Sequence, residues 1–234
     1  MTVEITLECP KCNQSEDIVK NGINKQNKQN YRCNRCNRQF IAPHELSYRG
    51  CQKGIAERIK YMLVRRLGIR DIAELEGISV KKVLSTLEDI SVKMKPSQSY
   101  YDSLEVDELW SYVKKKSKKY WLIYAYCRQT GEIVSWAWGK RDRKTVQQLW
   151  SNLKSAGVRV KAVCTDNWEA FKGVFKGCKH LIGKCFTKGI EGNNCRLRHR
   201  VSRLIRRTCC FSKKKSNHRK ACELAFFYIN NACV

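Results

Sequence analysis

Two pairs of cysteines near the N-terminus constrain the folding of this chain more than any other feature. Cys9 and Cys12 form one Cys-x-x-Cys pair, and Cys33 and Cys36 form a second pair after 20 intervening residues. Four thiolates at this spacing can meet tetrahedrally around one zinc ion, and so short a segment has no other means of folding. Two redox motifs or two disulfides are the alternative interpretation, which an intracellular setting disfavours. The pattern predicts one structural zinc in residues 1–43, with short strands between the pairs as in a zinc ribbon.

The net charge indicates a polyanionic partner. Lysine and arginine total 47 against 21 acidic residues, which gives a formal charge of +26. So much positive charge repels itself in a compact fold unless a partner neutralises it. Nucleic acid is the first candidate and a membrane surface the second, but no apolar run approaches the roughly 20 residues of a membrane helix, and no signal peptide pattern is present. We therefore expect a soluble cytoplasmic protein that binds nucleic acid and no membrane.

Residues 44–92 carry the periodicity of a small helical domain. Apolar residues recur at helical spacing from Ile55 onward, and a turn at Gly77 separates two short helices. Ser79 is expected to cap the second helix, which would direct Val80 and Val83 inward. The pattern is typical of a helix-turn-helix and equally of a generic helical hairpin, but the preceding ribbon and the basic charge favour DNA binding. The second helix would then offer these side chains to a major groove: Lys81, Lys82, Ser85 and Thr86.

Strand and helix patterns alternate beyond a polar linker at residues 93–103. Three β-rich runs, LEVDELWSYV, YWLIYAYCR and EIVSWAWG, are separated by turn-like segments, which predicts an antiparallel meander. The pattern then predicts a helix in RKTVQQLWSNLKS, a strand in VKAVCTD, a short helix in EAFKGVF, a strand in HLIGK and two final helices. We expect an α/β domain over residues 104–234, in which helices cover a mixed sheet.

Three acidic residues stand out in this basic domain. Asp107 lies in the first predicted strand, Asp166 ends the fourth, and Glu191 begins the penultimate helix. Carboxylates that converge at one end of a sheet repel one another unless divalent cations hold them, and two magnesium or manganese ions are an arrangement that cleaves phosphodiesters. Periodicity alone leaves the first ligand open, because Glu105 shares a strand face with Asp107 while Glu108 lies on the opposite face.

Together these motifs resemble the DDE transposases of bacterial insertion sequences, most closely the insertion-sequence-one family. The resemblance spans nearly the whole chain and rests on CPKC with YRCNRC, VDELWSYV, YWLIYAYCR, TDNW and IEGNNCRLR. Members of that family join a zinc ribbon and a helix-turn-helix to an RNase H-like catalytic domain. Their third acid follows the second after 24 residues, as Glu191 follows Asp166. The resemblance implies that Asp107, Asp166 and Glu191 are the catalytic ligands of two magnesium ions.

The same resemblance implies a transposase that binds the terminal inverted repeats of an insertion element and a target DNA. It would cleave DNA strands and join a 3′-hydroxyl to the target by transesterification, as a homodimer or higher oligomer on the prokaryotic nucleoid. Residues 196–220 hold eleven lysines or arginines and no acid, which indicates a DNA-binding track rather than an ordinary solvated face. Arg198 stands two turns after Glu191, a position suited to holding a phosphate. The expected contacts in this domain are Arg196, Arg198, Arg203, Arg206 and Arg207, with Trp168 for base stacking.

Two other functions remain open from the sequence. A DNA-binding regulator with an inactive RNase H-like domain would carry the same ribbon, helices and charge, although the intact set of acids argues against it. A serine or tyrosine recombinase would form a covalent bond to DNA and need no divalent metal. Metal dependence of strand cleavage separates these possibilities.

Overall fold

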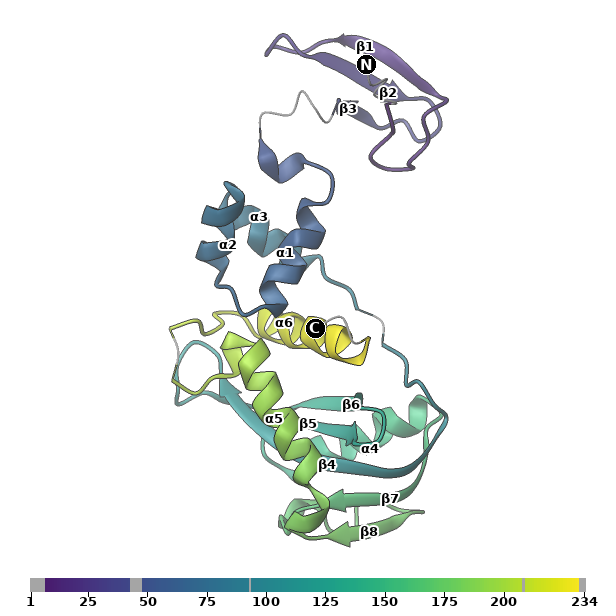
Figure 1. Cartoon of the computed structure of the whole chain (residues 1–234), viewed down its shortest axis with the longest axis vertical. Helices are drawn as coiled ribbons and strands as arrows, with labels where there is room; N and C mark the ends of the chain where they lie inside the picture. The colour runs from purple at the N-terminus through teal and green to yellow at the C-terminus, as the bar shows by residue number, and fades with distance from the viewer. Residues whose placement is uncertain (1–6, 43–47, 93, 208, 232–234) are drawn as a thin grey trace.

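The computed structural model describes residues 7–42, 48–92, 94–207 and 209–231. Three parts follow one another along the longest axis of the molecule: a small sheet, a group of short helices and a larger sheet covered by helices (Figure 1). Within the described residues, no helix combines the length and the apolar character needed to cross a membrane. The predicted ribbon and helical domain also include residues 1–6 and 43–47, which lie outside the described residues.

The N-terminal part is a three-stranded antiparallel sheet. Strands β1 (Ile18–Ile23), β2 (Gln29–Cys33) and β3 (Gln39–Ile41) pair in the order β1-β2-β3. Its buried cluster consists of Cys9, Cys33 and Phe40, with a few partly buried neighbours around it. So small an apolar cluster cannot by itself offset the conformational entropy lost on folding. The segment therefore needs a further source of stability, which a metal ion held by the four cysteines would supply.

Three helices form the middle part. A short 3-10 turn (Arg49–Cys51) precedes α1 (Ile55–Val64), α2 (Ile69–Glu76) and α3 (Val80–Glu88). The turn between α2 and α3 uses Gly77 at φ 61°, a left-handed conformation that favours glycine. The predicted cap is confirmed, since the Ser79 hydroxyl accepts a hydrogen bond of 3.1 Å from the Lys82 backbone N–H. Val80 is 42% exposed rather than directed inward, because it is the first residue of α3 and lies outside the buried cluster around Ile72 and Val83.

The C-terminal part contains the predicted mixed sheet. Strands β4 (Tyr100–Tyr112), β5 (Lys119–Cys127) and β6 (Glu132–Gly139) form the expected antiparallel meander. Strands β7 (Arg159–Thr165) and β8 (Lys179–Ile182) add in parallel on the other side of β4, which gives the order β6-β5-β4-β7-β8. β4 begins at Tyr100, so the last residues of the expected linker belong to the sheet. Tyr101 is buried in the core, and its backbone pairs with Val160 of β7.

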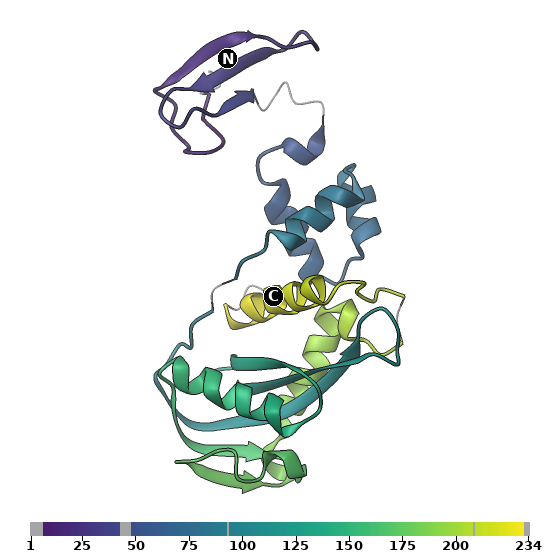
Figure 2. The same cartoon turned by 180° about the vertical axis from the view of Figure 1, so that it is seen from behind.

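Helices cover both faces of this sheet. Helix α4 (Arg143–Ser155) lies on one face (Figure 2), and α5 (Lys188–Arg200) and α6 (Lys215–Asn230) lie on the other (Figure 1). Alternation along β4 sends Val106 into the cluster with α4 and Leu109 into the cluster with α5 and α6. The predicted short helix after β7 is only a 3-10 turn (Glu169–Phe171), because Gly173 at φ 69° follows it and interrupts the helical path.

Helix α6 joins the middle part to the sheet domain. Helices α1 and α3 both pack against it. Val64, Leu87 and Ile90 from the helical part share one buried cluster with Leu122 of the sheet and Phe226 of α6. The C-terminal half of α3 is therefore part of an interface within the chain, and only its N-terminal half remains for an external partner.

Candidate active site

Strands β4 and β7 separate where the predicted acids lie. Their parallel ladder ends with Glu105 opposite Cys164, β7 ends one residue later, and Asp166 follows. β4 runs on to Tyr112 without β7 beside it, so Asp166 reaches the edge that carries Asp107. One carboxylate oxygen each from Asp107, Glu108 and Asp166 lies within 4.8 Å of the others. The structure thus brings two of the three predicted acids together and adds Glu108.

Asp107 is held from two sides. The Glu108 backbone N–H donates to Asp107 Oδ1 at 2.8 Å, and the Asn194 side-chain amide on α5 donates to Oδ2 at 2.7 Å. Burial, together with repulsion from Glu108 and Asp166, raises the pKa of Asp107 to about 6. Crowded carboxylate oxygens are the ligands that magnesium and manganese prefer, and a cation among them would offset their repulsion. The donor set therefore fits a hard divalent cation.

Asp166 sits in a turn fixed by its neighbours. The Trp168 backbone N–H donates to Asp166 Oδ1 at 3.0 Å, as in an Asx turn. The buried Thr165 hydroxyl donates to the Asp166 carbonyl at 2.8 Å and lies 2.8 Å from His180 Nε2 on β8. The position of Asp166 at the end of β7 is therefore set by the turn to Trp168 and by Thr165, whose hydroxyl also contacts β8.

Glu191 is not part of the carboxylate group. It is exposed in the first turn of α5, and Glu108 rather than Glu191 is the third acid near the two aspartates. The reason is the anchoring of α5 to the sheet. Glu105 Oε2 accepts a hydrogen bond of 2.6 Å from the Ile190 backbone N–H, which places Glu191 beside Glu105. Burial raises the pKa of the Glu105 carboxyl, and the charge of Glu191 acts in the same direction. Asn194, one turn further along, is the α5 residue that contacts Asp107.

This anchoring of α5 was not expected from the sequence. Gly189 makes it possible, since a Cβ at that position would stand 2.8 Å from Glu105 Oε1. Further along the helix, the buried Tyr124 hydroxyl, on the residue opposite Asp107 in β5, donates to Asn194 Oδ1 at 2.9 Å. The three-residue spacing of Asn194 from Glu191 on one helix face was the only sequence signal for its role.

Glu108 and Arg141 form an ion pair beside the site. Arg141 Nε and Nη2 donate to Glu108 Oε1 at 2.9 and 2.5 Å. The Arg141 guanidinium lies 4.5 Å from the Trp168 ring centroid and 5.3 Å from that of Trp121. Trp168, predicted for base stacking, is half-buried and already contacts Arg141 and the edge of Phe171. Its ring therefore helps to hold Arg141 in place.

Arg198 lies one turn beyond Asn194 on α5. It is half-buried, and its buried Nε has no hydrogen-bond partner among the described residues. Burial lowers its pKa, and the nearby Arg206 acts in the same direction, whereas Asp107 and Tyr124 oppose the shift. A buried guanidinium nitrogen without an acceptor is costly, and an anionic ligand would satisfy it.

The exposed face of α3 is smaller than predicted. Lys81 is exposed and Lys82 and Ser85 are half-buried, but Thr86 is only 5% exposed. The Thr86 hydroxyl donates to the Lys82 carbonyl at 2.9 Å. The prediction that Thr86 faces a groove is wrong, because the C-terminal half of α3 packs toward α6.

The basic segment after α5 divides into exposed and half-buried arginines. Arg206 and Arg207 are exposed, and the Arg206 guanidinium lies 4.9 Å from the Trp110 ring centroid. Arg196 is half-buried, with its charge close to Tyr126. Arg203 is half-buried as well, and its Nη1 donates to Ser212 Oγ at 2.8 Å. Burial lowers the pKa of Arg203. Because its guanidinium is hydrogen-bonded to Ser212, Arg203 connects two segments of the chain, whereas the sequence predicted a contact with DNA.

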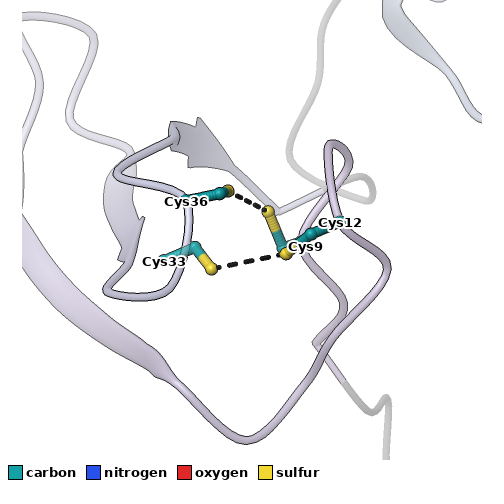
Figure 3. Close-up of side chains that lie close together, drawn as sticks. All are labelled: Cys9, Cys12, Cys33 and Cys36. Atoms are coloured by element: carbon teal, nitrogen blue, oxygen red, sulfur yellow. Dashed lines mark hydrogen bonds between the residues drawn. The ribbon is translucent and has the colours of Figure 1, made fainter.

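The four N-terminal cysteines converge as predicted. Cys9 Sγ lies 3.5 Å from Cys36 Sγ, and Cys12 Sγ lies 3.6 Å from Cys33 Sγ (Figure 3). All four sulfurs lie within 4.8 Å of one another, and none of the cysteines in the described ranges forms a disulfide. A tetrahedral zinc with Zn–S bonds of about 2.3 Å requires sulfurs roughly 3.8 Å apart. The cluster therefore fits one zinc ion.

Comparisons with known proteins concern mainly the sheet domain. A sequence model described as IS1 transposase matches residues 103–231. The insertion element iso-IS1n protein InsB of Shigella dysenteriae is 38% identical over 116 residues, which cover 50% of this chain and 87% of that protein. The insertion element IS1 2 protein InsB of Escherichia coli strain K12 is 34% identical over 133 residues, or 57% of this chain and 78% of that protein.

A likeness to a solved structure is weaker. It is to a chain in the simian T-cell lymphotropic virus intasome in complex with the PP2A regulatory subunit B56 gamma. The TM-score is 0.36 with 15% identity, over 62% of this chain and 58% of the other. A likeness at this level carries no argument about function.

Proposed function

Because this chain belongs to the IS1 transposase family, we propose that it cleaves DNA at the ends of an insertion element and joins the exposed 3′-hydroxyl to a target strand. The observation that carries the proposal is the convergence of Asp107 and Asp166 where β4 and β7 separate. Strand order β6-β5-β4-β7-β8, with three antiparallel strands followed by two parallel ones, supports an RNase H-like assignment. This is a DDE-type reaction, with no covalent bond between protein and DNA.

Asp107 and Asp166 would hold the divalent cations of this reaction. Magnesium or manganese bound there would supply activation of the attacking oxygen and stabilisation of the leaving oxygen. Asn194 fixes the Asp107 carboxylate through Oδ2, and Tyr124 fixes the Asn194 amide in turn. Because the carboxylate is oriented before the substrate arrives, little reorganisation is needed during the reaction.

Glu191 is proposed as the third catalytic acid, acting from the rim of the site. It lies on α5 one turn before Asn194, the residue that contacts Asp107. Residues three apart on a helix have Cβ atoms about 5–6 Å apart. From that position the Glu191 carboxylate would join Asp107 and Asp166 in holding a divalent cation.

Arg198 is proposed to bind a phosphate next to the scissile bond. Its Nε lacks an acceptor among the described residues, and its position two turns after Glu191 places it beyond Asn194 on the same side of α5. A guanidinium can bind a phosphate through two parallel hydrogen bonds. The basic groups would thus hold the DNA backbone while the acids hold the cations.

The ribbon and the helical part are proposed to recognise the terminal inverted repeats. They lie outside the residues matched by the family, so this assignment rests on their own structure. Lys81 on α3 is exposed and Lys82 and Ser85 are half-buried, and Lys82 lines a cavity together with Arg38 of the N-terminal sheet part. Joining two element ends requires at least two copies of the chain on DNA, so we propose a homodimer or larger assembly.

The test of the proposed function is cation-dependent cleavage. The substrate is DNA flanking the coding frame, where the terminal repeats of an insertion element lie. With magnesium or manganese the protein should produce a 3′-hydroxyl at the element end and a strand-transfer product, and EDTA should abolish both products. Cleavage that persists in EDTA with a covalent protein–DNA adduct would reject this mechanism in favour of a recombinase. Specific binding of this DNA without cleavage under any divalent cation would identify a regulator.

Exposed arginines after α5 give a prediction about non-specific affinity. Replacing Arg206 and Arg207 with glutamate should weaken binding to all DNA sequences, because each phosphate contact releases a condensed counterion. The slope of log K against log salt should fall by about 2, roughly one unit for each lost contact. Filter binding from low to moderate salt measures this slope, and Lys161→Glu, an exposed basic residue on β7, is the control. An unchanged slope in the double variant would remove this segment from the DNA interface.

A further inference from the structure

Glu108 is an acid that the family resemblance leaves without a role. It follows Asp107 directly on β4, so strand alternation places its Cβ on the face of the sheet opposite to that of Asp107. One of its carboxylate oxygens nevertheless lies within 4.8 Å of ligand oxygens of both Asp107 and Asp166. This approach is possible because β7 no longer pairs with β4 at this level.

The contact with Arg141 leaves half of the Glu108 carboxylate free. Arginine and carboxylate groups commonly pair through two parallel hydrogen bonds that use both oxygens. Here Arg141 Nε and Nη2 both donate to Oε1. Oε2 is buried and has no hydrogen-bond partner among the described residues, and the Glu108 side chain as a whole is only 7% exposed.

An unpaired buried carboxylate oxygen needs a physical reason. Leaving a buried charged acceptor without a donor costs free energy, and placing it beside two further carboxylates adds repulsion. If the only role of Glu108 were to hold Arg141, hydrogen bonds to both carboxylate oxygens would stabilise the ion pair further. A divalent cation shared with Asp107 and Asp166 removes both costs, because it pairs Oε2 and neutralises the neighbouring acids.

We propose that Glu108 is a further ligand of the divalent cation held by Asp107 and Asp166, through its Oε2 oxygen. Arg141, between the rings of Trp121 and Trp168, fixes Oε1 and keeps the other oxygen available. The inference rests on the proposed function, since it adds a ligand to the same cation site. Glu108 would be the third acid of the carboxylate group, to which Glu191 does not belong.

Manganese binding to the zinc-loaded full chain without DNA tests the proposal. Bound and free manganese are distinguished by electron paramagnetic resonance, and the readout does not depend on catalysis. Glu108→Gln keeps the shape of the side chain and removes its charge, and the Kd for manganese should rise at least tenfold. Glu169→Gln is the matched control, because Glu169 is an exposed acid three residues after Asp166 that pairs with Lys172, and its Kd should stay at the wild-type value.

Asp107→Asn separates this inference from the proposed function. If Asp107→Asn abolishes manganese binding while Glu108→Gln binds as the wild type does, Glu108 is not a ligand and only this inference is overturned. If wild type and both variants bind alike, the cation site itself is overturned. Should Glu108→Gln fail to fold, Glu108→Asp keeps the charge opposite Arg141 and withdraws the carboxylate by one methylene. The same tenfold loss is then expected, and wild-type affinity in that variant overturns the proposal.

Discussion

Removal of zinc should unfold the N-terminal ribbon while the sheet domain stays folded. The buried cluster of the ribbon is little more than Cys9, Cys33 and Phe40, so a zinc ion held by the four cysteines would supply most of the free energy that keeps residues 7–42 ordered. The sheet domain has its own extensive core on both faces of the sheet and does not depend on these cysteines. Metal analysis should find one zinc per chain. A strong chelator should collapse the amide NMR dispersion of the ribbon alone.

Two cysteine variants serve as the comparison for this prediction. Replacing both Cys33 and Cys36 with serine should abolish zinc binding and give the spectrum of the chelated protein. Replacing Cys195 with serine, an exposed cysteine on α5, should leave zinc content and spectrum unchanged. A ribbon that stays folded, contains no zinc and carries disulfides at these cysteines would overturn the assignment.

Loss of the Asp166 carboxylate should give the largest effect on activity. Asp166→Asn keeps the size of the side chain and its hydrogen bond from the Trp168 backbone N–H, but it removes one of the charges that hold the cation. Metal ions contribute several kcal/mol to the transition state, so the rate of strand cleavage should fall at least a thousandfold, or ~4 kcal/mol. Single-turnover cleavage of an element-end substrate in magnesium measures this change.

DNA affinity should separate a catalytic defect from a folding or binding defect. Asp166→Asn should bind the element-end DNA as tightly as the wild type or more tightly, because it removes a negative charge near the phosphate backbone. Glu169→Gln, with its exposed side chain paired to Lys172, should retain wild-type cleavage. Cleavage by Asp166→Asn within tenfold of the wild type would show that this carboxylate is not a cation ligand.

Local patterns were enough to predict most of the secondary structure. Helix α4 and strand β6 have the bounds expected from RKTVQQLWSNLKS and EIVSWAWG, since hydrophobic periodicity and turn residues act within a few positions of the chain. The cysteine cluster was predictable for a related reason, because two close pairs of thiolates have few other ways to pair. The family was recognisable from short motifs around the same elements.

Contacts between distant segments were not predictable in this way. Thr86 was expected at a DNA surface, yet it is buried on α3, which packs against α6, a helix more than 100 residues later in the chain. Arg203 was expected on the basic track, yet its partner Ser212 and its burial follow from how the segment after α5 packs. Periodicity assigns a residue to one face of a helix or strand, but which segment covers that face depends on the tertiary structure.

By itself, the sequence determined the order of elements, the cluster of four cysteines, the basic charge and the convergence of Asp107 with Asp166, because these depend on local spacing and composition. Only the tertiary structure decided which third acid stands beside them. Anchoring of α5 to Glu105 places Glu191 at the rim, and the separation of β4 from β7 lets Glu108 approach from the other face of the strand. Strand alternation is a rule about one strand, whereas the acids in a cation site are brought together by where neighbouring strands end.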